Sequence, residues 1–326
     1  MHSLKIGDVC LKNNLFCAPL AGYTDFAFRK LCYSFGAGLC FTEMVSAKGL
    51  KYNNETTRKL LYRGEGEPQT AAQLFGGDPA IMRAACESED LKDFRIIDIN
   101  MGCPAPKVAG NGGGAALMKN PLLAGRITQA VAQAVPVPVT VKFRKGWDEE
   151  HVNAVEFARI MQESGAAVVA VHGRTRQQFY APPVDLEIIA QVKAAVSIPV
   201  IGNGGCDSVQ SVKKMYDYTK CDLVMIGQGA LGRPWIFAQV AAYLERGQLL
   251  PDPPLERRLE IMLEQFSLAC SFKGEGQAMR EARKHAGWYL KGMRGAAAFR
   301  RQAGQLCTLE DAKALARAVL AANPQQ

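Results

Sequence analysis

The stretch IIDINMGCPAPK spans Ile96–Lys107, and we interpret the rest of the chain as organised around it. Ile96–Ile99 is a short, mostly apolar run typical of a buried strand in a parallel sheet. The run stops at Asn100, and the glycine and prolines that follow predict a turn. This turn carries a single thiol, that of Cys103, just beyond the end of a buried strand.

Short apolar segments alternate with amphipathic helical segments up to about residue 235, the pattern of successive β–α units on a parallel sheet. Eight strands are expected, at Leu15–Leu20, Leu39–Glu43, Thr70–Phe75, Ile96–Asn100, Val137–Phe143, Ala167–His172, Pro199–Gly202 and Leu223–Ile226. Helices are expected between most of them, at Asp25–Phe35, Pro79–Ser88, Pro121–Ala134, Val152–Ser164, Leu186–Ala195 and Ser208–Tyr216. The alternation predicts an α/β fold, specifically a (β/α)8 TIM barrel.

A doubly wound open sheet is the alternative architecture. Polar or special residues recur at the carboxyl ends of the expected strands, namely Gln73, Asn100, Cys103, Lys142, Arg144, His172 and Asn203. In a closed barrel these ends share one face, which is where the active sites of such barrels lie. An open sheet would scatter the same residues, so the pattern favours the barrel.

The Pro-rich stretch Gly247–Pro254 follows the last expected strand and predicts a linker. Beyond it, the periodic apolar residues predict three or four helices in a small bundle. Breaks between these helices are expected at Gly274–Gly276 and Gly292–Gly295, with Thr308 as the N-cap of the last helix. We therefore expect a barrel domain over residues 1–246, carrying the catalytic site, and a helical domain over 247–326.

The composition is that of a soluble globular protein, with 48% of the 326 residues apolar and 21% charged. No run of about 18 apolar residues is present, which argues against a membrane-spanning helix. The first ten residues lack the apolar core of a signal peptide, so we expect a cytoplasmic protein. We also expect a monomer.

Ten cysteines are spread along the chain without a C-x-x-C pair, and we expect them to stay reduced. Cys17, Cys40 and Cys221 lie in apolar runs and are interpreted as small buried hydrophobic residues. The four histidines do not cluster with the cysteines, so no metal site is expected.

The net charge of +8 does not by itself indicate a nucleic-acid partner, but its distribution is informative. Residues 273–301 contain eight lysines and arginines against two glutamates. Such a basic segment fits a polyanion, and a solvated basic helix face has the same pattern.

Two glycine-rich segments follow the seventh and eighth expected strands, at Gly202–Gly205 and Gly227–Gly232. In many TIM barrels these two loops bind a phosphate group, because glycine lets backbone N–H groups approach the anion. The second segment also matches G-x-G-x-x-G, the dinucleotide motif. We reject that reading because the motif belongs to the first β–α unit of a Rossmann fold, not to an eighth strand.

Three strand ends carry candidate catalytic or binding groups. A lysine in an apolar strand is costly unless it faces a partner, so Lys142 is either a Schiff-base lysine or a cation beside the electron-rich edge of a flavin. His172 precedes Arg174 and Arg176, whose guanidinium groups suit phosphate contacts. Cys103 has no base nearby in sequence, which leaves both a nucleophile and a protonated donor open.

Seven ordered motifs carry a resemblance to a known family. They are Ala18-Pro-Leu-Ala-Gly-Tyr-Thr-Asp25, Thr42–Leu50, Gln73–Gly76, Asn100-Met-Gly-Cys-Pro104, Val141–Arg144 with His172–Arg176, Asn203-Gly204, and Gly229-Ala-Leu-Gly-Arg-Pro-Trp235. Together they resemble the tRNA-dihydrouridine synthases, and among these the bacterial B-type branch. The basic helical tail around Arg283–Lys291 is similar to the tRNA-binding bundle of that family.

The resemblance implies an FMN enzyme that reduces the C5=C6 bond of uridine in tRNA, with NADPH reducing the flavin. It implies that Cys103 gives a proton to C5 and that Asn100 lies beside the ring and the substrate. The implied flavin-binding residues are Ala18, Pro19, Leu20, Gln73, Lys142, His172, Asn203, Gly204, Gly205, Gly227 and Gln228. The implied contacts to tRNA phosphates are Arg174, Arg176, Arg283, Lys284 and Lys291, with Trp288 and Tyr289 stacking on bases.

The chain departs from the family pattern at three places. Gly205 stands where an aspartate is common, Gln228 where an arginine is usual, and Gly114 where a serine often precedes the alanine. The missing arginine removes one positive charge from the expected phosphate-binding loops. This loss either lowers the affinity for FMN or is compensated by Arg233 or Arg174.

Three other functions share parts of this pattern. A flavin enzyme acting on a free pyrimidine would use the same barrel and cysteine but would not need the basic tail. A barrel aldolase using Lys142, or an RNA-binding module without turnover, would involve no redox chemistry.

Overall fold

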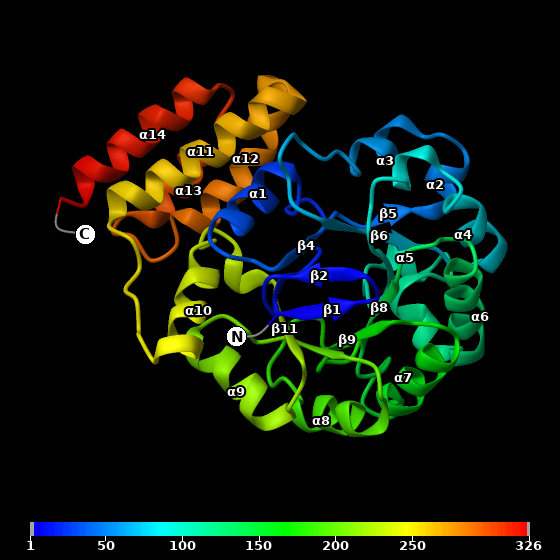
Figure 1. Ribbon diagram of the computed structural model, residues 1–326. Coiled ribbons are helices and arrows are strands. Elements are labelled where there is room, and N and C mark those ends of the chain that lie inside the picture. The colour runs from blue at the N-terminus through cyan, green and yellow to red at the C-terminus, as the bar shows by residue number, and fades with distance from the viewer. Residues whose placement is uncertain (1–2, 325–326) are drawn as a thin grey trace.

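The computed structural model describes residues 3–324 as a closed barrel of eight parallel strands with a helical bundle against one side (Figure 1). The barrel strands are β3 (Leu15–Cys17), β4 (Leu39–Phe41), β6 (Thr70–Phe75), β7 (Ile97–Met101), β8 (Val139–Arg144), β9 (Val168–His172), β10 (Val200–Asn203) and β11 (Leu223–Ile226). Their order is β4-β3-β11-β10-β9-β8-β7-β6, and pairing of β4 with β6 closes the barrel. The predicted (β/α)8 fold is confirmed.

All eight expected strands are present, and the differences lie at their ends. β3 stops at Cys17 instead of Leu20, because Pro19 has no N–H to extend the ladder. β8 continues to Arg144, one residue further than expected. A two-residue strand, β5 (Val45–Ser46), was not predicted, and it pairs with the end of β6.

Helices cover the outside of the barrel. The six expected ones are α1 (Phe26–Ser34), α4 (Pro79–Ala85), α6 (Pro121–Ala132), α7 (Ala154–Glu163), α8 (Leu186–Ala195) and α9 (Val209–Thr219). Five of them begin at a side chain that accepts a backbone N–H: Asp25, Asp78, Asn120, Asp185 and Ser208. Short elements missed by the sequence are α2 (Ala47–Lys51), α3 (Glu55–Lys59), η1 (Glu89–Leu91), α5 (Pro106–Ala109), η2 (Gly114–Lys119) and η3 (Gln228–Ala230), and α10 (Ile236–Arg246) completes the barrel.

Side chains of β7 and β8 alternate between the inside and the outside of the barrel, as the pleat requires. Ile97, Ile99 and Met101 point outward into the main hydrophobic core, beneath the helices. Asp98 and Asn100 therefore point inward, opposite Thr140 and Lys142 of β8 in the register. This alternation concentrates polar groups inside the upper half of the barrel.

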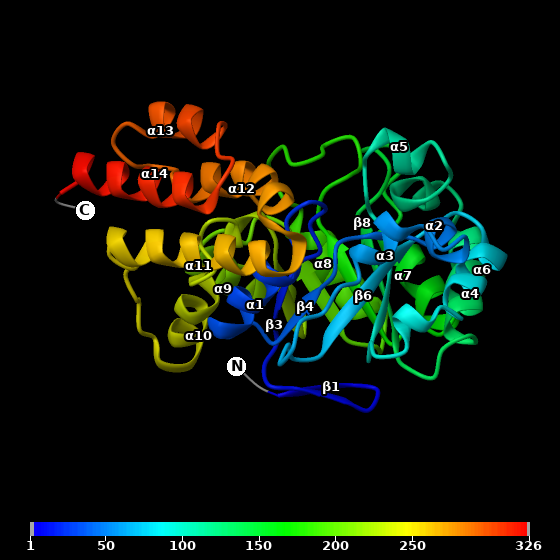
Figure 2. The ribbon, with the colours of Figure 1, turned by 90° about the horizontal axis from the view of Figure 1, so that it is seen from above.

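A β-hairpin of β1 (Leu4–Ile6) and β2 (Val9–Leu11) covers the amino-terminal end of the barrel, at the lower edge of Figure 2. The sequence analysis did not predict it. Ile6, Val9 and Leu11 belong to one apolar cluster with inward-facing residues such as Phe16 and Met225. The hairpin thus closes the bottom of the barrel, and the polar end is left for ligands.

Residues 247–254 contain no helix or strand and lead into four helices, as predicted. These are α11 (Leu255–Lys273), α12 (Glu275–Tyr289), α13 (Ala296–Ala303) and α14 (Leu309–Ala322). They share a second apolar core, which also takes in Leu31 and Trp235 from the barrel side. Thr308 caps α14 in a reciprocal capping box with Asp311, so that prediction is confirmed.

The bundle meets the barrel through a close backbone approach and an ion-pair network. Gly232 has φ +66°, and a Cβ there would lie 2.5 Å from the carbonyl carbon of Trp288. Lys273 of α11 bridges Asp25 at 2.6 Å and Glu281 at 2.5 Å. Only glycine fits at position 232, because any side chain there would collide with the Trp288 backbone. The Lys273 ammonium neutralises the half-buried carboxylate of Asp25.

Among residues 3–324, no helix is long and apolar enough to cross a membrane. Within the same range, no group of three or more histidine, cysteine or acidic side chains is arranged to hold a metal ion. All ten cysteines are free thiols, and Cys17, Cys40 and Cys221 are buried, as predicted.

We predict that Lys273→Met lowers the free energy of unfolding by roughly 3 kcal/mol, because it leaves Asp25 partly buried without its cation. In the double variant Asp25→Asn/Lys273→Met the loss should be smaller than the sum of the two single losses, since Asn still caps α1. Denaturant unfolding measures both.

The exposed pair Lys213–Asp217 offers a matched control. Lys213→Met should leave the unfolding midpoint unchanged, since exposed pairs contribute little. If Lys273→Met and Lys213→Met lower the free energy of unfolding equally, the ion pairs of Lys273 do not stabilise the contact between barrel and bundle.

Candidate active site

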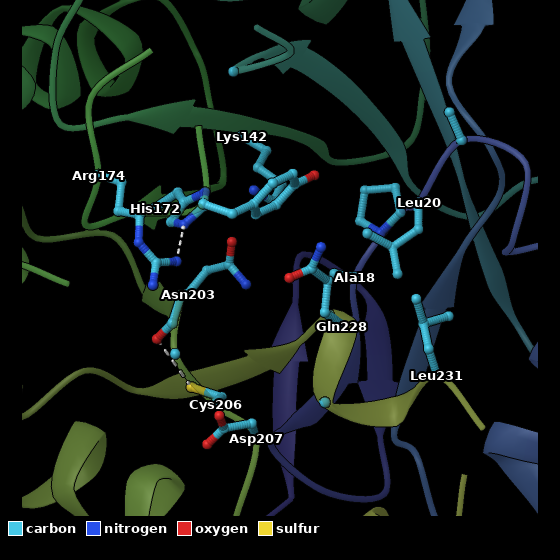
Figure 3. A pocket seen from close by; sticks show the side chains of 18 of the residues that line it. Ala18, Leu20, Lys142, His172, Arg174, Asn203, Cys206, Asp207, Gln228 and Leu231 are labelled. Carbon is cyan, nitrogen blue, oxygen red and sulfur yellow. Dashed lines mark hydrogen bonds between the residues drawn. The ribbon is translucent and has the colours of Figure 1, made fainter. Parts of the chain in front are cut away.

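A cavity of about 770 Å³ opens at the carboxyl ends of the barrel strands and extends to the bundle (Figure 3). Its size lies within the range of roughly 300–1,000 Å³ usual for small-molecule sites. Strand ends and the loops after them supply most of its wall, and Trp288, Lys291 and Gly292 from the bundle complete it. The cavity therefore belongs to both parts of the chain.

A relay of hydrogen bonds runs from the floor of the cavity to the Cys103 loop. Buried Asp98 accepts from Gln73 Nε2 at 2.7 Å, and Gln73 Oε1 accepts from Asn100 Nδ2 at 2.9 Å. Asn100 Oδ1 in turn accepts from the backbone N–H of Cys103 at 2.9 Å. Burial raises the pKa of Asp98 to about 6, so the carboxylate is ionised at neutral pH and only accepts. It thereby sets the direction of every bond in the relay.

The thiol of Cys103 lies at the cavity wall, and the backbone at Gly114 and Ala115 packs against the loop that carries it. The backbone N–H of Ala115 donates to the Cys103 carbonyl at 3.0 Å. Gly114, with φ +56°, passes so close that a Cβ there would lie 2.8 Å from that carbonyl oxygen. Burial raises the pKa of Cys103 above its ordinary value, outweighing the nearby Arg144 and Lys142. The thiol is protonated at neutral pH, which favours a proton donor over a thiolate nucleophile.

Two cations from β8 have different roles. Lys142 faces the cavity, and burial, followed by the charge of Arg144, lowers its pKa to about 8. Arg144 donates from Nε to Gly102 O and from Nη1 to Thr175 O and Phe179 O, each at 2.8 Å. Lys142 is thus available to a ligand, whereas Arg144 fastens the Cys103 loop to the loop after β9.

The far wall of the cavity is built by β9 and β10. Burial is the main cause that lowers the pKa of His172 well below its ordinary value, so the imidazole is neutral. Arg174 Nη1 lies 3.3 Å from His172 Nε2, and Asn203 Nδ2 donates to Met225 O at 2.8 Å. Gly204 has φ +110°, and a Cβ there would lie 2.7 Å from the His172 ring. The neutral His172 ring therefore packs closely on the Gly204 backbone, and both border the cavity.

The structure brings nearly all of the predicted site residues into this one cavity. Those lining it are Ala18, Pro19, Leu20, Gln73, Asn100, Cys103, Lys142, His172, Arg174, Asn203, Gly204, Gly205, Gly227, Gln228 and Lys291. Figure 3 shows Ala18 and Gln228 among these lining residues. Arg233 and Arg174, the expected substitutes for a missing arginine, also line it.

Three predicted residues lie elsewhere. Arg176 packs over Trp147 on the outer rim, and Lys284 lies over the Tyr23 ring. Arg283 donates from Nε to Leu306 O at 2.9 Å, inside the bundle. Tyr289 is 1% exposed, so its expected stacking on RNA bases is wrong; Trp288 does reach the cavity.

Several lining or supporting residues were missed. Met44, Tyr180, Asp207, Asp252 and Arg258 line the cavity, and of these only Met44 lies in a motif that the sequence analysis named. Asp98 was detectable, because it lies two residues before Asn100 in the same strand and so points to the same side. An acid at an inward strand position is a recognisable signal of a buried polar network.

The chain is similar in sequence to known proteins over nearly its whole length. The family model "Dihydrouridine synthase" matches residues 16–323. tRNA-dihydrouridine synthase B of Pseudomonas aeruginosa is 43% identical over 94% of this chain and 92% of its own length. The protein of the same name from Shewanella oneidensis is 44% identical over 88% of this chain and 89% of its own length.

More distant solved structures share only the fold. The 6-hydroxypseudooxynicotine amine oxidase of Pseudomonas geniculata N1 matches with a TM-score of 0.58 at 16% identity, over 74% of this chain and 49% of that one. Histamine dehydrogenase from Rhizobium sp. 4-9 matches with a TM-score of 0.56 at 12% identity, over 87% of this chain and 50% of that one. With more than 40% identity to curated relatives over nearly its whole length, the chain belongs to the dihydrouridine synthase family.

Proposed function

We propose that this protein is a flavin-dependent reductase that converts uridine in tRNA to dihydrouridine, with FMN as cofactor and NADPH as reductant. The observation that carries the proposal is the cavity itself. In a chain of the dihydrouridine synthase family, it joins a protonated Cys103, the inward-facing Lys142 and two glycine loops at the mouth of one barrel.

The residues lining the cavity fit FMN in chemistry and shape. Ala18, Pro19 and Leu20 offer an apolar side to a flat ring, and Lys142 offers a cation to its electron-rich pyrimidine edge. Gly204 and Gly227 line the cavity with backbone alone, which lets backbone N–H groups approach a ribityl chain and phosphate. When bound, FMN supplies the hydride for the C5=C6 bond of uracil.

Cys103 supplies the proton in this proposal. Its Sγ carries hydrogen at neutral pH and lies in the same cavity as Lys142 and Asn100. The relay from Asp98 holds the backbone N–H of Cys103, which fixes the point on the cavity wall from which the thiol extends. The sulfur gives its proton to C5, and Arg144 and Lys142 favour the thiolate that is left behind.

The substrate reaches the cavity between barrel and bundle. Lys291 and Trp288 line the cavity on the bundle side, where the chain is most basic. A uracil base must leave the RNA stack to enter, which costs a few kcal/mol, and contacts of cations to phosphates offset that cost. We propose that residues 1–246 carry the catalytic site and that 247–326 bind tRNA, in the cytoplasm.

The function is tested with unmodified tRNA, FMN, NADPH and the purified protein. Dihydrouridine should form, and Cys103→Ala should lower its formation at least a hundredfold, the usual range for losing a general acid. Reduction of the bound flavin by NADPH should be unchanged in that variant. Reduction of free uracil but not of tRNA would support a free-pyrimidine enzyme instead.

The affinity of the apoprotein for FMN should depend on pH through Lys142. Its pKa is about 8, so the side chain is charged below that pH and loses its attraction for the flavin edge as the pH rises through 8. Fluorescence quenching of FMN should show affinity falling roughly tenfold between pH 7 and 9.5. Lys142→Met should bind weakly at every pH, and an unchanged pH profile in this variant would refute the assignment.

Asp98→Asn tests the relay. An amide can donate or accept, so it no longer dictates the orientation of Gln73 and Asn100. We expect the rate of uridine reduction to fall roughly tenfold to a hundredfold, the cost of losing charge-assisted hydrogen bonds. Thr140→Val removes a neighbouring donor to Asp98 but keeps the charge, and its loss should be several times smaller.

A further inference from the structure

Outside the cavity, four side chains stack on the rim of the barrel and form what we name the rim stack: Lys119, Trp147, Arg176 and Phe179. Lys119 Nζ lies 3.9 Å from the centre of the Trp147 ring, and Arg176 Cζ lies 4.7 Å from it. Arg176 Cζ is also 5.8 Å from the Phe179 ring centre. Cations and aromatic rings therefore alternate along one row.

The rim stack is rigidly connected to the Cys103 loop. The backbone N–H of Arg176 donates to Gly146 O at 2.9 Å, and that of Gln177 donates to Trp147 O at 3.0 Å. Arg144 binds the carbonyls of Thr175 and Phe179 and also that of Gly102. The row is thus held in a constant position relative to the Cys103 thiol.

Phe179 is kept in an unfavourable conformation. Its φ is +50°, which is a genuine outlier for a bulky residue, and its side chain is 41% exposed. Burial does not explain an aromatic residue that remains this exposed at a position better suited to glycine. Strain of this kind persists at functional sites, and the next residue, Tyr180, is 49% exposed and lines the cavity.

The charge of the rim suits an anionic partner. Two of the three acids next to Trp147 are already paired, Asp148 with His151 and Glu149 with Lys145. Glu150 is the third acid in this run. Lys119 and Arg176 bind no carboxylate among the ion pairs of residues 3–324, and each lies over an aromatic ring.

The barrel topology places the rim stack across from the bundle. Trp147 follows β8, and β8 lies four strands from β3 in either direction around the barrel. The bundle packs on α1, which follows β3. A uridine that enters the cavity from a polynucleotide has a phosphodiester on each side. The nucleotides that precede and follow it must therefore lie on different sides of the cavity mouth.

We propose that the rim stack binds the RNA strand on the side of the target uridine away from the bundle, with a base stacking on Phe179 and phosphates contacting Arg176 and Lys119, which Trp147 holds in place. The inference rests on the proposed function and extends it to a second contact surface on the substrate. Alternating cations and aromatic rings along a groove are the means by which proteins hold unpaired nucleotides.

The test uses the FMN-loaded protein and an unmodified tRNA transcript. Phe179→Gly should weaken tRNA binding roughly tenfold, the scale of losing one stacked base. It should also leave the melting temperature unchanged or raise it, because glycine tolerates φ +50°. Flavin reduction by NADPH should be unaffected.

Arg176→Gln should weaken tRNA binding and reduce its salt dependence by about one unit of the log–log slope. Tyr218→Ala is the matched control, since Tyr218 is 52% exposed on α9 and lies outside the rim stack. It should bind tRNA like the unaltered protein.

The outcomes separate the two proposals. If the unaltered protein forms dihydrouridine but Phe179→Gly and Arg176→Gln bind tRNA with unchanged affinity, the rim stack is refuted and the function stands. If the unaltered protein binds tRNA but forms no dihydrouridine, while both variants bind more weakly, the function fails and the rim stack stands. If the unaltered protein does not bind tRNA, both are overturned.

Discussion

One buried carboxylate governs the arrangement of the active site. Asp98 is 1% exposed at the centre of the barrel, where burial raises its pKa to about 6 and still leaves it ionised at neutral pH. A carboxylate only accepts hydrogen bonds, so the amides of Gln73 and Asn100 are forced into one orientation each. The backbone N–H of Cys103 donates to Asn100 Oδ1, the last acceptor in this row of hydrogen bonds. A buried charge is expensive, and the attraction of Lys142 above it compensates part of the cost.

The barrel makes this arrangement possible because parallel strands with a fixed register place alternate side chains in layers. Asp98 stands opposite Gln73 on one side and Thr140 on the other, and Asn100 stands opposite Lys142 one layer higher. The same alternation turns Ile97 and Ile99 outward into the helix-covered core. Stability and chemistry therefore depend on opposite faces of the same strands, and a shift of one residue in register would exchange them.

The helical bundle is part of the site and not only an attachment to it. Gly232 permits backbone contact with Trp288, and Trp288 Nε1 donates to the Tyr23 hydroxyl at 3.3 Å. Gly232 is the last glycine of the G-x-G-x-x-G match, so this glycine has a packing role instead of a dinucleotide-binding one. Because the bundle supplies Trp288 and Lys291 to the cavity wall, its docking determines the shape of that side of the cavity.

Period-two patterning and polar residues at strand ends are local signals, and they were enough to predict the barrel, its eight strands and most of the cavity. The sequence also determined the bundle, the linker and the cap at Thr308. Only the tertiary structure decided which basic residues face the cavity: Lys291 does, whereas Arg283 is bound to Leu306 O within the bundle. It likewise decided that Tyr289 is buried and that Trp147 stacks between Lys119 and Arg176. These contacts join residues far apart in the chain, and no local pattern records which face of a helix or loop will meet them.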